Sequence, residues 1–243
     1  MIHDASAVIL AAGQGKRMRT HLPKSMVPVA GRPIIGHLLS AVRQAGVSDV
    51  VVVVGHKAET LRTYLGPEVS TPLQSVRLGT AHAVETAKDS VGAAQDVFVL
   101  VGDSPLIRST SIARLYETHR QSGAACSFLT AQFDISLPYA RVLRGEDGAV
   151  REVIEERDCT PEQKKVREYL TSHFVFSADA LWPLLAGVVP HPVTQERYLT
   201  DVLGSLLVAG ERVEAVVIDD WRELVGLNTP EEVAWAEEAM AHG

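Results

Sequence analysis

Cationic side chains follow a glycine-containing loop near the start of the chain. Arg17 and Lys24 come after the segment from Leu10 to Gly15, where an apolar run ends in small residues and two glycines. Glycines let backbone N–H groups approach phosphate oxygens closely, and nearby cations supply the charge that a triphosphate needs. This combination indicates that the loop handles a nucleotide.

Two common phosphate-binding loops do not match this segment. The glycine spacing and the missing Gly-Lys-Ser/Thr ending exclude a Walker loop. The segment also lacks the third glycine of the dinucleotide-binding fingerprint, because Arg17 and Met18 occupy that region. An ordinary strand and turn with incidental basic residues is the alternative that the loop alone leaves open.

Two oxygen-bearing side chains are candidate metal ligands. Asp103 follows a buried, valine-rich run, and Asn228 lies just before a helix start at Pro230. Mg²⁺ prefers oxygen ligands and usually shares its shell with substrate phosphates. Each residue alone also fits a simple turn or cap.

The amide of Gln74 offers a donor and an acceptor, which match the imide edge of uracil or thymine. His82 lies at an apolar helix start, so we expect packing or a local hydrogen bond there rather than a base. The sequence shows no Ser-His-Asp arrangement, and its histidines lack zinc-ligand spacing.

Composition narrows the function classes. The chain has 243 residues, is 46% hydrophobic and carries a net charge of -7, which argues against a general nucleic-acid binder. Its two cysteines give no disulfide framework. No apolar run approaches the about 18 residues of a membrane span, and no secretory leader is evident. We expect a cytoplasmic protein without a membrane partner.

Strand-like and helix-like segments alternate in the first half. Short β-branched runs predict strands over residues 8–10, 49–54 and 97–101, and amphipathic patterns predict helices over 34–45, 58–64, 80–88 and 110–121. Such alternation predicts an α/β fold with a mixed, mostly parallel sheet and helices on both faces. Ligands bind beyond the carboxyl ends of such strands, so the opening loop and Asp103 should meet there.

The second half is less regular. We expect strands over 125–130, 141–144, 149–155, 169–176 and 213–218, and helices over 179–185 and 198–207. Thr229 is the expected N-cap of a closing helix over about 229–242. Residues 1–243 then form one domain, with a nucleotide-binding part over about 1–110 and a sugar-binding part over about 111–228.

Many of these segments together resemble the N-acetylglucosamine-1-phosphate uridylyltransferase domain of bacterial GlmU, a sugar-1-phosphate nucleotidyltransferase. The similar segments, in the same order, are 10–18, 22–24, Gln74, 78–80, 102–106, 139–141, 154–158, 196–201 and 225–228. Their agreement is more specific than any one motif. The resemblance implies a Rossmann-like GT-A fold. It also implies Mg²⁺-dependent transfer of a uridylyl group from UTP to a sugar 1-phosphate, which releases pyrophosphate and gives UDP-N-acetylglucosamine or the UDP derivative of a related hexose.

The resemblance also implies roles for individual residues. It implies that Arg17 and Lys24 are catalytic and that Asp103 and Asn228 bind the metal ion. The residues implied to bind the sugar are Ala140, Glu155, Leu170 and Tyr198. The residues implied to bind the nucleotide are Leu10, Ala11, Ala12, Gly13, Gly15, Lys24, Gln74, Gly79 and Thr80.

Two departures from the family pattern affect the sugar site. The family's Gly-Tyr-Gly is here Pro138-Tyr139-Ala140, and its Asn-Thr-Gly is Leu170-Thr171-Ser172. Leucine cannot replace the hydrogen bonds of an amide, and an unpaired polar group costs about 1–3 kcal/mol. We therefore expect a sugar other than N-acetylglucosamine, or weak binding of that sugar.

Other functions remain open at this point. The chain could use dTTP or CTP, or sense a nucleotide sugar without turnover. No hexapeptide repeat of a left-handed β-helix is present, so we expect no acetyltransferase activity of the kind that GlmU carries.

Overall fold

The computed structural model of the chain describes residues 2–133 and 137–242. The first and last residues of the expected domain, and residues 134–136 of its expected sugar-binding part, lie outside the described residues.

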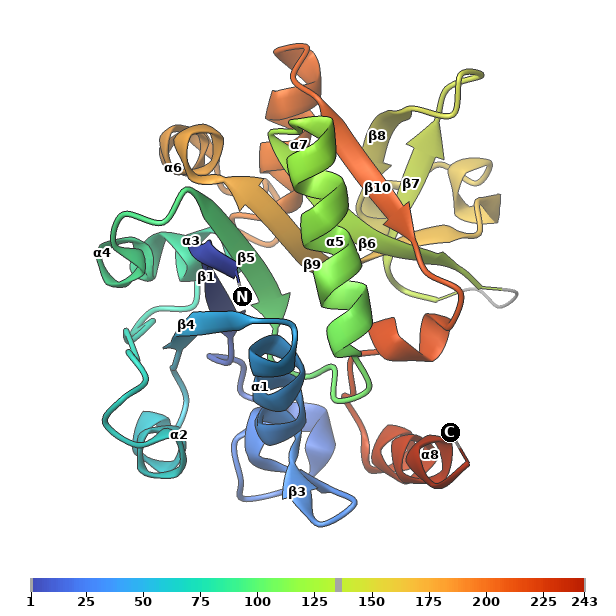
Figure 1. Ribbon diagram of the computed structural model, residues 1–243. Helices are drawn as coiled ribbons and strands as arrows, with labels where there is room; N and C mark the ends of the chain where they lie inside the picture. Colours follow the sequence, from blue (N-terminus) through green and yellow to red (C-terminus); the bar gives the residue numbers. More distant parts are fainter. Residues whose placement is uncertain (1, 134–136, 243) are drawn as a thin grey trace.

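A central sheet organises the described residues (Figure 1). Its main path runs β10-β6-β9-β5-β1-β4, and the β7–β8 hairpin joins it through β9. The strand bounds are β1 Ile2–Leu10, β4 Val47–Val53, β5 Asp96–Val101, β6 Cys126–Gln132, β7 Ala140–Arg144, β8 Val150–Ile154, β9 Glu168–Ser177 and β10 Val213–Val217, and a separate pair contains β2 Pro28–Val29 and β3 Arg32–Pro33.

The sheet is mixed, which confirms the predicted fold class. Strand β1 pairs in parallel with β4 and β5, and β10 pairs in parallel with β6. Strand β9 lies antiparallel between β5 and β6. Strand β1 begins at Ile2 rather than at the predicted Val8. The apolar pattern did not mark this start, because His3 and Asp4 are polar and exposed.

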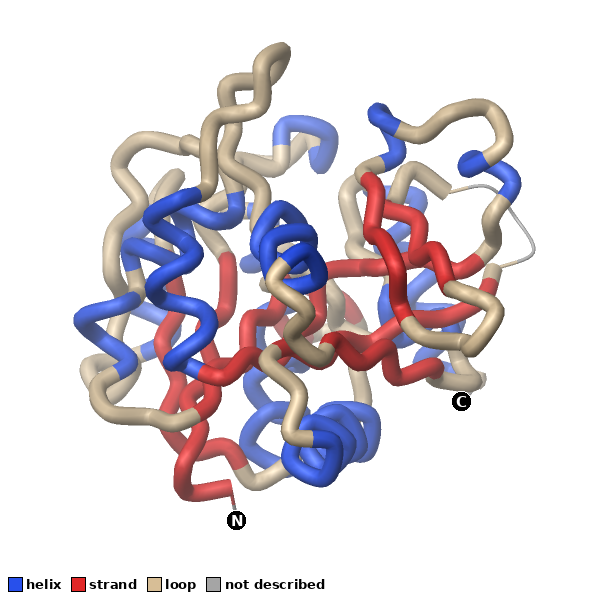
Figure 2. Tube along the Cα trace, turned by 90° about the horizontal axis from the view of Figure 1, so that it is seen from above, coloured by secondary structure: helices blue, strands red, loops and turns tan. Residues whose placement is uncertain are grey.

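Helices cover both faces of the sheet, as Figures 1 and 2 show. Side chains alternate along β1, so Val8 belongs to one core and Ile9 to the other. The Val8 core is covered by α3 Thr80–Thr86, α4 Lys88–Val91, α6 Ala178–Gly187 and α7 Thr200–Val208. The Ile9 core is covered by α1 Ile34–Gln44, α2 Ala58–Leu65 and α5 Ser109–Ser122.

The closing helix α8, Pro230–Ala241, packs at one end of the molecule near the β2–β3 hairpin (Figure 1). Thr229 caps it as predicted, and the side chain of Glu232 completes a capping box with the backbone of Thr229. Leu227 and Ala236 share a small apolar core with Met18, which fixes α8 against the opening loop.

Two predicted boundaries near the expected sugar site were wrong. Strand β8 ends at Ile154, and Glu155 instead precedes a short 3₁₀ turn, Glu156–Asp158. Helix α7 begins at Thr200 rather than at Tyr198, and the N–H of its N-cap Leu199 donates to the Thr80 hydroxyl, 2.9 Å away. Glu155 and Tyr198, two of the four expected sugar ligands, therefore lie outside the strands and α-helices.

Other predicted elements were shorter or broken. The helix expected over 80–88 is interrupted at Ala87, which caps α3 and precedes α4. Further 3₁₀ turns span Lys16–Met18, Lys24–Met26, Gln163–Lys165 and Trp221–Leu224. Within residues 2–133 and 137–242, no helix has the length and apolar character needed to cross a membrane.

Candidate functional site

The ends of β1 and β5 bring two loops together. Leu10 and Val101 are register partners, and the Gly102 N–H donates to the Leu10 carbonyl, 2.9 Å away. The opening loop and the Asp103 segment therefore leave the sheet side by side, as expected from the parallel pairing.

The opening loop folds back on the segment that holds Lys24. Gly15 has a φ of 61°, a left-handed backbone conformation that residues other than glycine rarely adopt. A Cβ at this position would also lie 2.6 Å from the Lys24 Cβ. Glycine thus permits the tight approach that places Arg17 and Lys24 at the same edge.

Four side chains from distant parts of the sequence meet at this edge. The Lys24 ammonium donates to Asp103 Oδ2 and to Asn228 Oδ1, the latter 2.7 Å away. The Arg17 guanidinium donates to the same Asn228 oxygen at 3.0 Å. Two cations and two oxygen-bearing side chains thus form one connected site.

The backbone around Asn228 is fixed by its neighbours. The Leu227 N–H donates to the Asp103 carbonyl, 2.9 Å away. A Cβ on Gly226 would lie 2.9 Å from Asp103 Oδ1, so a residue without a side chain is needed there. The Glu232 carboxylate accepts from the Asn228 N–H and, at 3.1 Å, from the Thr229 N–H. The capping box of α8 therefore also positions Asn228.

The residues fit a divalent cation. Asp103 Oδ1 is buried and has no hydrogen-bond partner in the part of the chain that the structure describes. The Lys24 ammonium already bridges the Asp103 and Asn228 oxygens as a stand-in cation. Since no group of three or more His, Cys, Asp or Glu side chains surrounds such a position among the described residues, phosphate oxygens and water would complete the shell.

The predicted phosphate-binding residues line a small cavity beside this site. It measures about 80 Å³. Its lining includes Leu10, Ala11, Gly13, Lys24, Ser25, Gly102 and Asp103. The neighbouring Ala12 is buried, whereas Gly13 is exposed.

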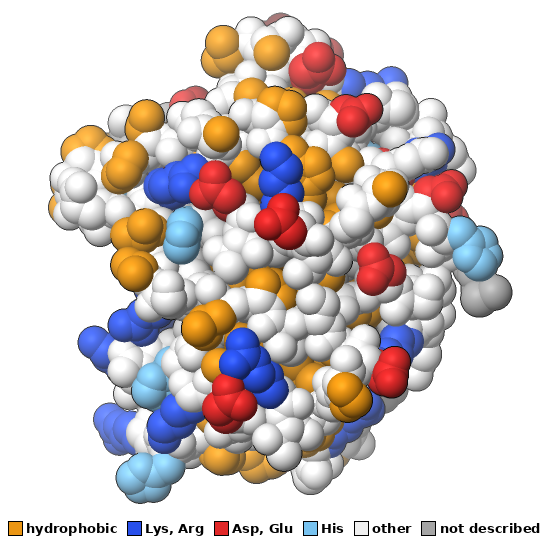
Figure 3. All heavy atoms as spheres, turned by 90° about the vertical axis from the view of Figure 1, so that its left-hand side faces the viewer, with side chains coloured by type: hydrophobic (Ala, Val, Ile, Leu, Met, Phe, Trp, Pro, Cys, Tyr) orange, Lys and Arg blue, Asp and Glu red, His pale blue; other side chains and the backbone are white. Residues whose placement is uncertain are grey.

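Figure 3 shows Lys, Arg and His side chains gathered along the lower left margin of one face, so a protein with a negative net charge still presents local positive charge.

The predicted base-binding residues form a hydrogen-bonded group. The Gln74 amide nitrogen donates to the Gly79 carbonyl and contacts His82 Nδ1, each at 3.0 Å. The expected local hydrogen bond of His82 is confirmed. The protein thus engages the Gln74 amide nitrogen, and the pairing of this side chain with a base stays a prediction.

The nucleotide-side segment is joined to the second half of the chain. The Thr80 hydroxyl accepts from the Leu199 N–H at 2.9 Å, and the Ala81 N–H donates to the Arg197 carbonyl at 3.0 Å. Gly79 lies against the backbone of Arg197. The predicted nucleotide and sugar parts therefore share one wall.

Two of the four predicted sugar residues belong to the hydrophobic core. Ala140 and Leu170 are register partners on β7 and β9, with exposed fractions of 5% and 2%. Leu170 lies in the Val8 core together with Phe174. The position at which the family pattern has asparagine is thus a packing position here.

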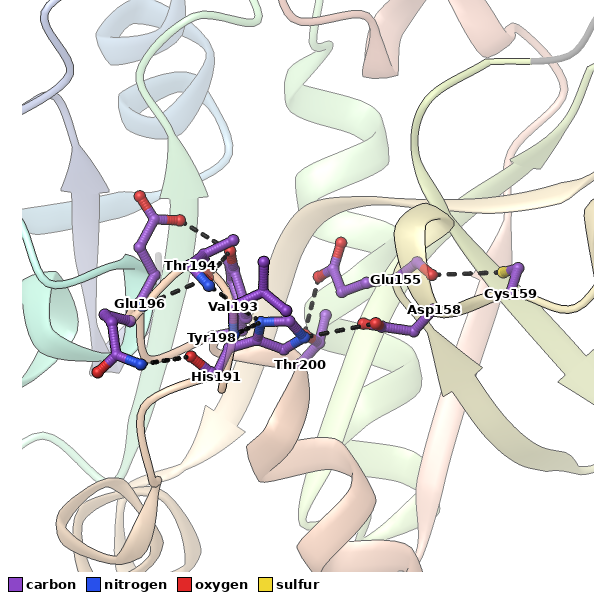
Figure 4. A network of polar contacts seen from close by, with 10 residues as sticks. Glu155, Asp158, Cys159, His191, Val193, Thr194, Glu196, Tyr198 and Thr200 are labelled. Carbon is purple, nitrogen blue, oxygen red and sulfur yellow. Dashed lines mark hydrogen bonds and ion pairs between the residues drawn. The ribbon is translucent and has the colours of Figure 1, made fainter.

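The other two predicted sugar residues lie in a polar network (Figure 4). Glu155 Oε1 accepts from the Thr200 hydroxyl at 2.8 Å, and burial raises the pKa of the Glu155 carboxyl. The Tyr198 hydroxyl donates to Glu196 Oε2 at 2.8 Å, and the Arg157 guanidinium lies 4.9 Å from the Tyr198 ring centre. This network is separate from the Asp103 site.

Comparisons with known proteins agree with this geometry. Residues 7–216 match the model of the MobA-like NTP transferase domain. The chain belongs to this family of nucleotidyltransferases. It is 39% identical over 240 residues to the bifunctional protein GlmU of Heliobacterium modesticaldum, which confirms the resemblance found in the motifs. The match covers 98% of this chain and 52% of that protein, so the chain spans about half the length of this relative.

Solved nucleotidyltransferases share the fold. A UDP-glucose pyrophosphorylase bound to UDP-glucose superposes with a TM-score of 0.80 at 17% identity, covering 98% of both chains. A Bacillus anthracis protein described as a glucose-1-phosphate thymidylyltransferase superposes with a TM-score of 0.79 at 18% identity, covering 97% of this chain and 94% of that one. These two similarities establish the Rossmann-like architecture.

A larger cavity in this nucleotidyltransferase was not anticipated from the sequence. It measures about 480 Å³ and reaches Asp103 and Asn228. Its lining also includes Arg17, Thr171, Ser172, Glu232 and the rings of Tyr139, Trp221 and Trp235. Tyr139 and Trp221 pack against the Ile9 core, on the opposite face from Leu170. The sequence had singled out Arg17, Asp103 and Asn228, and the Thr229-x-x-Glu232 capping pattern marks Glu232, but no local pattern pointed to the three rings.

Proposed function

We propose that the chain transfers a uridylyl group from UTP to a sugar 1-phosphate with the help of Mg²⁺. The convergence of Arg17, Lys24, Asp103 and Asn228 carries this proposal. Cations and hard oxygen ligands at the end of a parallel strand pair suit a polyphosphate and a divalent ion.

The transfer needs positioning and charge neutralisation more than a protein nucleophile. An oxygen of the sugar phosphate attacks the α-phosphorus of UTP, a new P–O bond forms, the α–β bridge bond breaks, and pyrophosphate leaves. Arg17 and Lys24 neutralise the phosphate charge that builds up. A bound Mg²⁺, held by Asp103 and Asn228, supplies Lewis-acid charge to the phosphate oxygens.

The Gln74 carbonyl supports a base with an imide N–H. It is the free hydrogen-bonding side of a buried amide, since Gly79 and His82 engage the nitrogen. Uracil and thymine share this N–H, whereas cytosine lacks it, so dTTP is a second candidate and CTP is disfavoured.

The acceptor that we propose is a hexose 1-phosphate without an acetamido group. Leu170 is an apolar core residue where the family pattern has an amide. The sugar's acetamido group would therefore lack the amide partner that the family pattern provides, whereas a simpler hexose leaves nothing unpaired at that position.

The decisive experiment measures pyrophosphate release with UTP, Mg²⁺ and a panel of sugar 1-phosphates. The panel contains glucose, galactose, N-acetylglucosamine and N-acetylgalactosamine, and each reaction is repeated with dTTP and CTP. We expect turnover with UTP and a hexose that is lost in Asp103→Ala. Efficient, selective use of N-acetylglucosamine 1-phosphate would overturn the proposed acceptor, and nucleotide binding without any turnover would indicate a sensor.

A further inference from the structure

The Lys24 ammonium lies between the two residues that would hold the metal ion. It donates to Asp103 Oδ2 and to Asn228 Oδ1, which is 2.7 Å away. The Lys24 side chain is 15% exposed and that of Asp103 is 23% exposed. The ion pair is therefore largely shielded from bulk water and is stronger than a typical surface pair.

A divalent ion and this ammonium would compete for the same pair of side chains. An ion held by the Asp103 carboxylate and Asn228 Oδ1 would lie within a few ångströms of the Lys24 ammonium, and two like charges at that range repel strongly in a partly desolvated site. Arg17 adds a second positive charge, because its guanidinium lies 3.0 Å from Asn228 Oδ1. A metal ion arriving alone must displace Lys24 without providing it with a new anionic partner.

The nucleotide would supply that partner. Lys24 lines the same small cavity as Leu10, Ala11 and Gly13, the start of the loop predicted to hold the phosphates. A triphosphate in that loop offers the ammonium new anionic oxygens a short distance away. The ammonium then leaves Asp103 and Asn228 free, while the phosphates add oxygen ligands for the ion.

We propose that Lys24 is the resident counter-ion of the metal site and makes metal binding depend on prior or simultaneous nucleotide binding. The inference rests on the proposed function, because it assumes that Asp103 and Asn228 hold a divalent ion during transfer. Lys24 then has two successive partners: the metal ligands before the nucleotide binds, and the nucleotide phosphates afterwards.

The test measures Mn²⁺ binding to the protein without nucleotide, by the loss of the free-ion electron paramagnetic resonance signal. Lys24→Met removes the competing ammonium and should bind Mn²⁺ about tenfold or more tightly than the unmodified protein, since a hydrogen bond to a charged group is lost. Lys24→Gln provides a second, polar variant, and circular dichroism checks that both fold. Lys16→Met removes the same charge from an exposed neighbour and should leave Mn²⁺ affinity unchanged.

The inference is overturned if both Lys24 variants bind Mn²⁺ no more tightly than the unmodified protein, or if Lys16→Met gains as much. A calorimetric titration with Mn²⁺ and UTP together separates this result from failure of the proposed function. One result would be that Asp103→Asn weakens binding of the Mn²⁺–UTP complex while Lys24→Met does not raise the affinity for Mn²⁺ alone. The proposed metal site would then be supported, and the proposed dependence of metal binding on the nucleotide would be wrong. If Asp103→Asn changes neither titration, both proposals fail.

Discussion

At the ends of β1 and β5, three charged side chains and the amide of Asn228 face one another, and a buried oxygen of Asp103 has no partner among the residues that the structure describes. Around Glu155 and Tyr198, by contrast, polar groups bond to neighbours within residues 155–200. The first region keeps a buried oxygen without a protein partner among the described residues, whereas the polar groups of the second are largely satisfied by one another.

The comparison separates the chemistry of transfer from the choice of acceptor. Nucleotidyl transfer requires cations and hard oxygen ligands whatever the sugar, and we propose that the Asp103 edge supplies them. Recognition of the acceptor depends on shape and on a few hydrogen bonds, and Leu170 shows that a polar position can become core. The following predictions test this separation.

Asp103→Asn should give the largest effect and fall on the transfer step. The variant keeps the size of the side chain but removes the anionic oxygens that face Lys24 and the proposed ion. We expect turnover to fall by roughly 100- to 1000-fold in pyrophosphate release. Asp147→Asn, in the exposed β7–β8 turn, is the matched control. Equal losses in both variants would show that Asp103 has no special role.

His173 links stability to pH beneath the Asp103 edge. Burial lowers the pKa of His173 from 6.5 to about 4, although the negative charge of Asp103 opposes this shift. The unfolded chain takes up the proton first, so the stabilisation is complete above about pH 6.5 and is lost as the pH falls toward 4. The loss amounts to roughly 3 kcal/mol. Urea unfolding of His173→Leu should show a flatter pH profile over this window, and parallel profiles would refute the assignment.

Leu170→Asn tests whether the acceptor side has lost an amide. Placing a polar group in the Val8 core should lower the free energy of unfolding by about 1–3 kcal/mol. The same amide should improve kcat/KM for N-acetylglucosamine 1-phosphate relative to glucose 1-phosphate by about tenfold. Leu170→Met keeps the apolar volume and should leave this ratio unchanged. A ratio that stays constant in Leu170→Asn would remove Leu170 from the specificity argument.

Glu155→Gln should affect acceptor binding more than nucleotide binding. The carboxylate accepts from Thr200 and is raised in pKa by burial, so a neutral amide is tolerated structurally. We expect the KM for the acceptor to rise by about tenfold while the KM for UTP stays within about twofold. Exposed Glu152→Gln is the control. A change confined to the KM for UTP would contradict the division between the two regions.

Thr229→Ala should have the smallest effect. It removes the hydroxyl that caps α8, which costs about 1 kcal/mol. In a chain of this size the melting temperature should fall by about 2–4 °C, and calorimetry measures it. Because Glu232 still holds the Asn228 N–H, we expect turnover to change little. A large loss of turnover would show that the cap itself positions Asn228.

Local patterns predicted the strands and helices that position the Asp103 edge. The β-branched run before Leu10 and the run before Asp103 could be read directly, because buried parallel strands are short and apolar. The Thr229–Pro230 pair marked the start of α8 in the same way. The parallel pairing of β1 and β5 then follows from topology rules, and with it the meeting of their loops.

The acceptor side was less predictable from the residues. Tyr198 and Glu155 were expected in a helix and a strand, yet α7 begins later, at Thr200, and β8 ends earlier, at Ile154. The Leu199 N–H before α7 instead contacts a distant group, the Thr80 hydroxyl. The large cavity was missed because its rings come from separate parts of the chain, including Tyr139 and Trp235. No local pattern encodes such an assembly.

The sequence by itself determined the residue types available for transfer, the alternation that builds an α/β fold, and the cap of the closing helix. Each depends on neighbours a few positions apart, where periodicity and backbone preference act directly. The tertiary structure alone decided that Lys24 bridges Asp103 and Asn228 and that Leu170 packs in the core. It also decided that the Gln74 amide nitrogen donates to a group of the protein itself. These outcomes depend on which distant groups share a buried space, and packing of the whole sheet sets that.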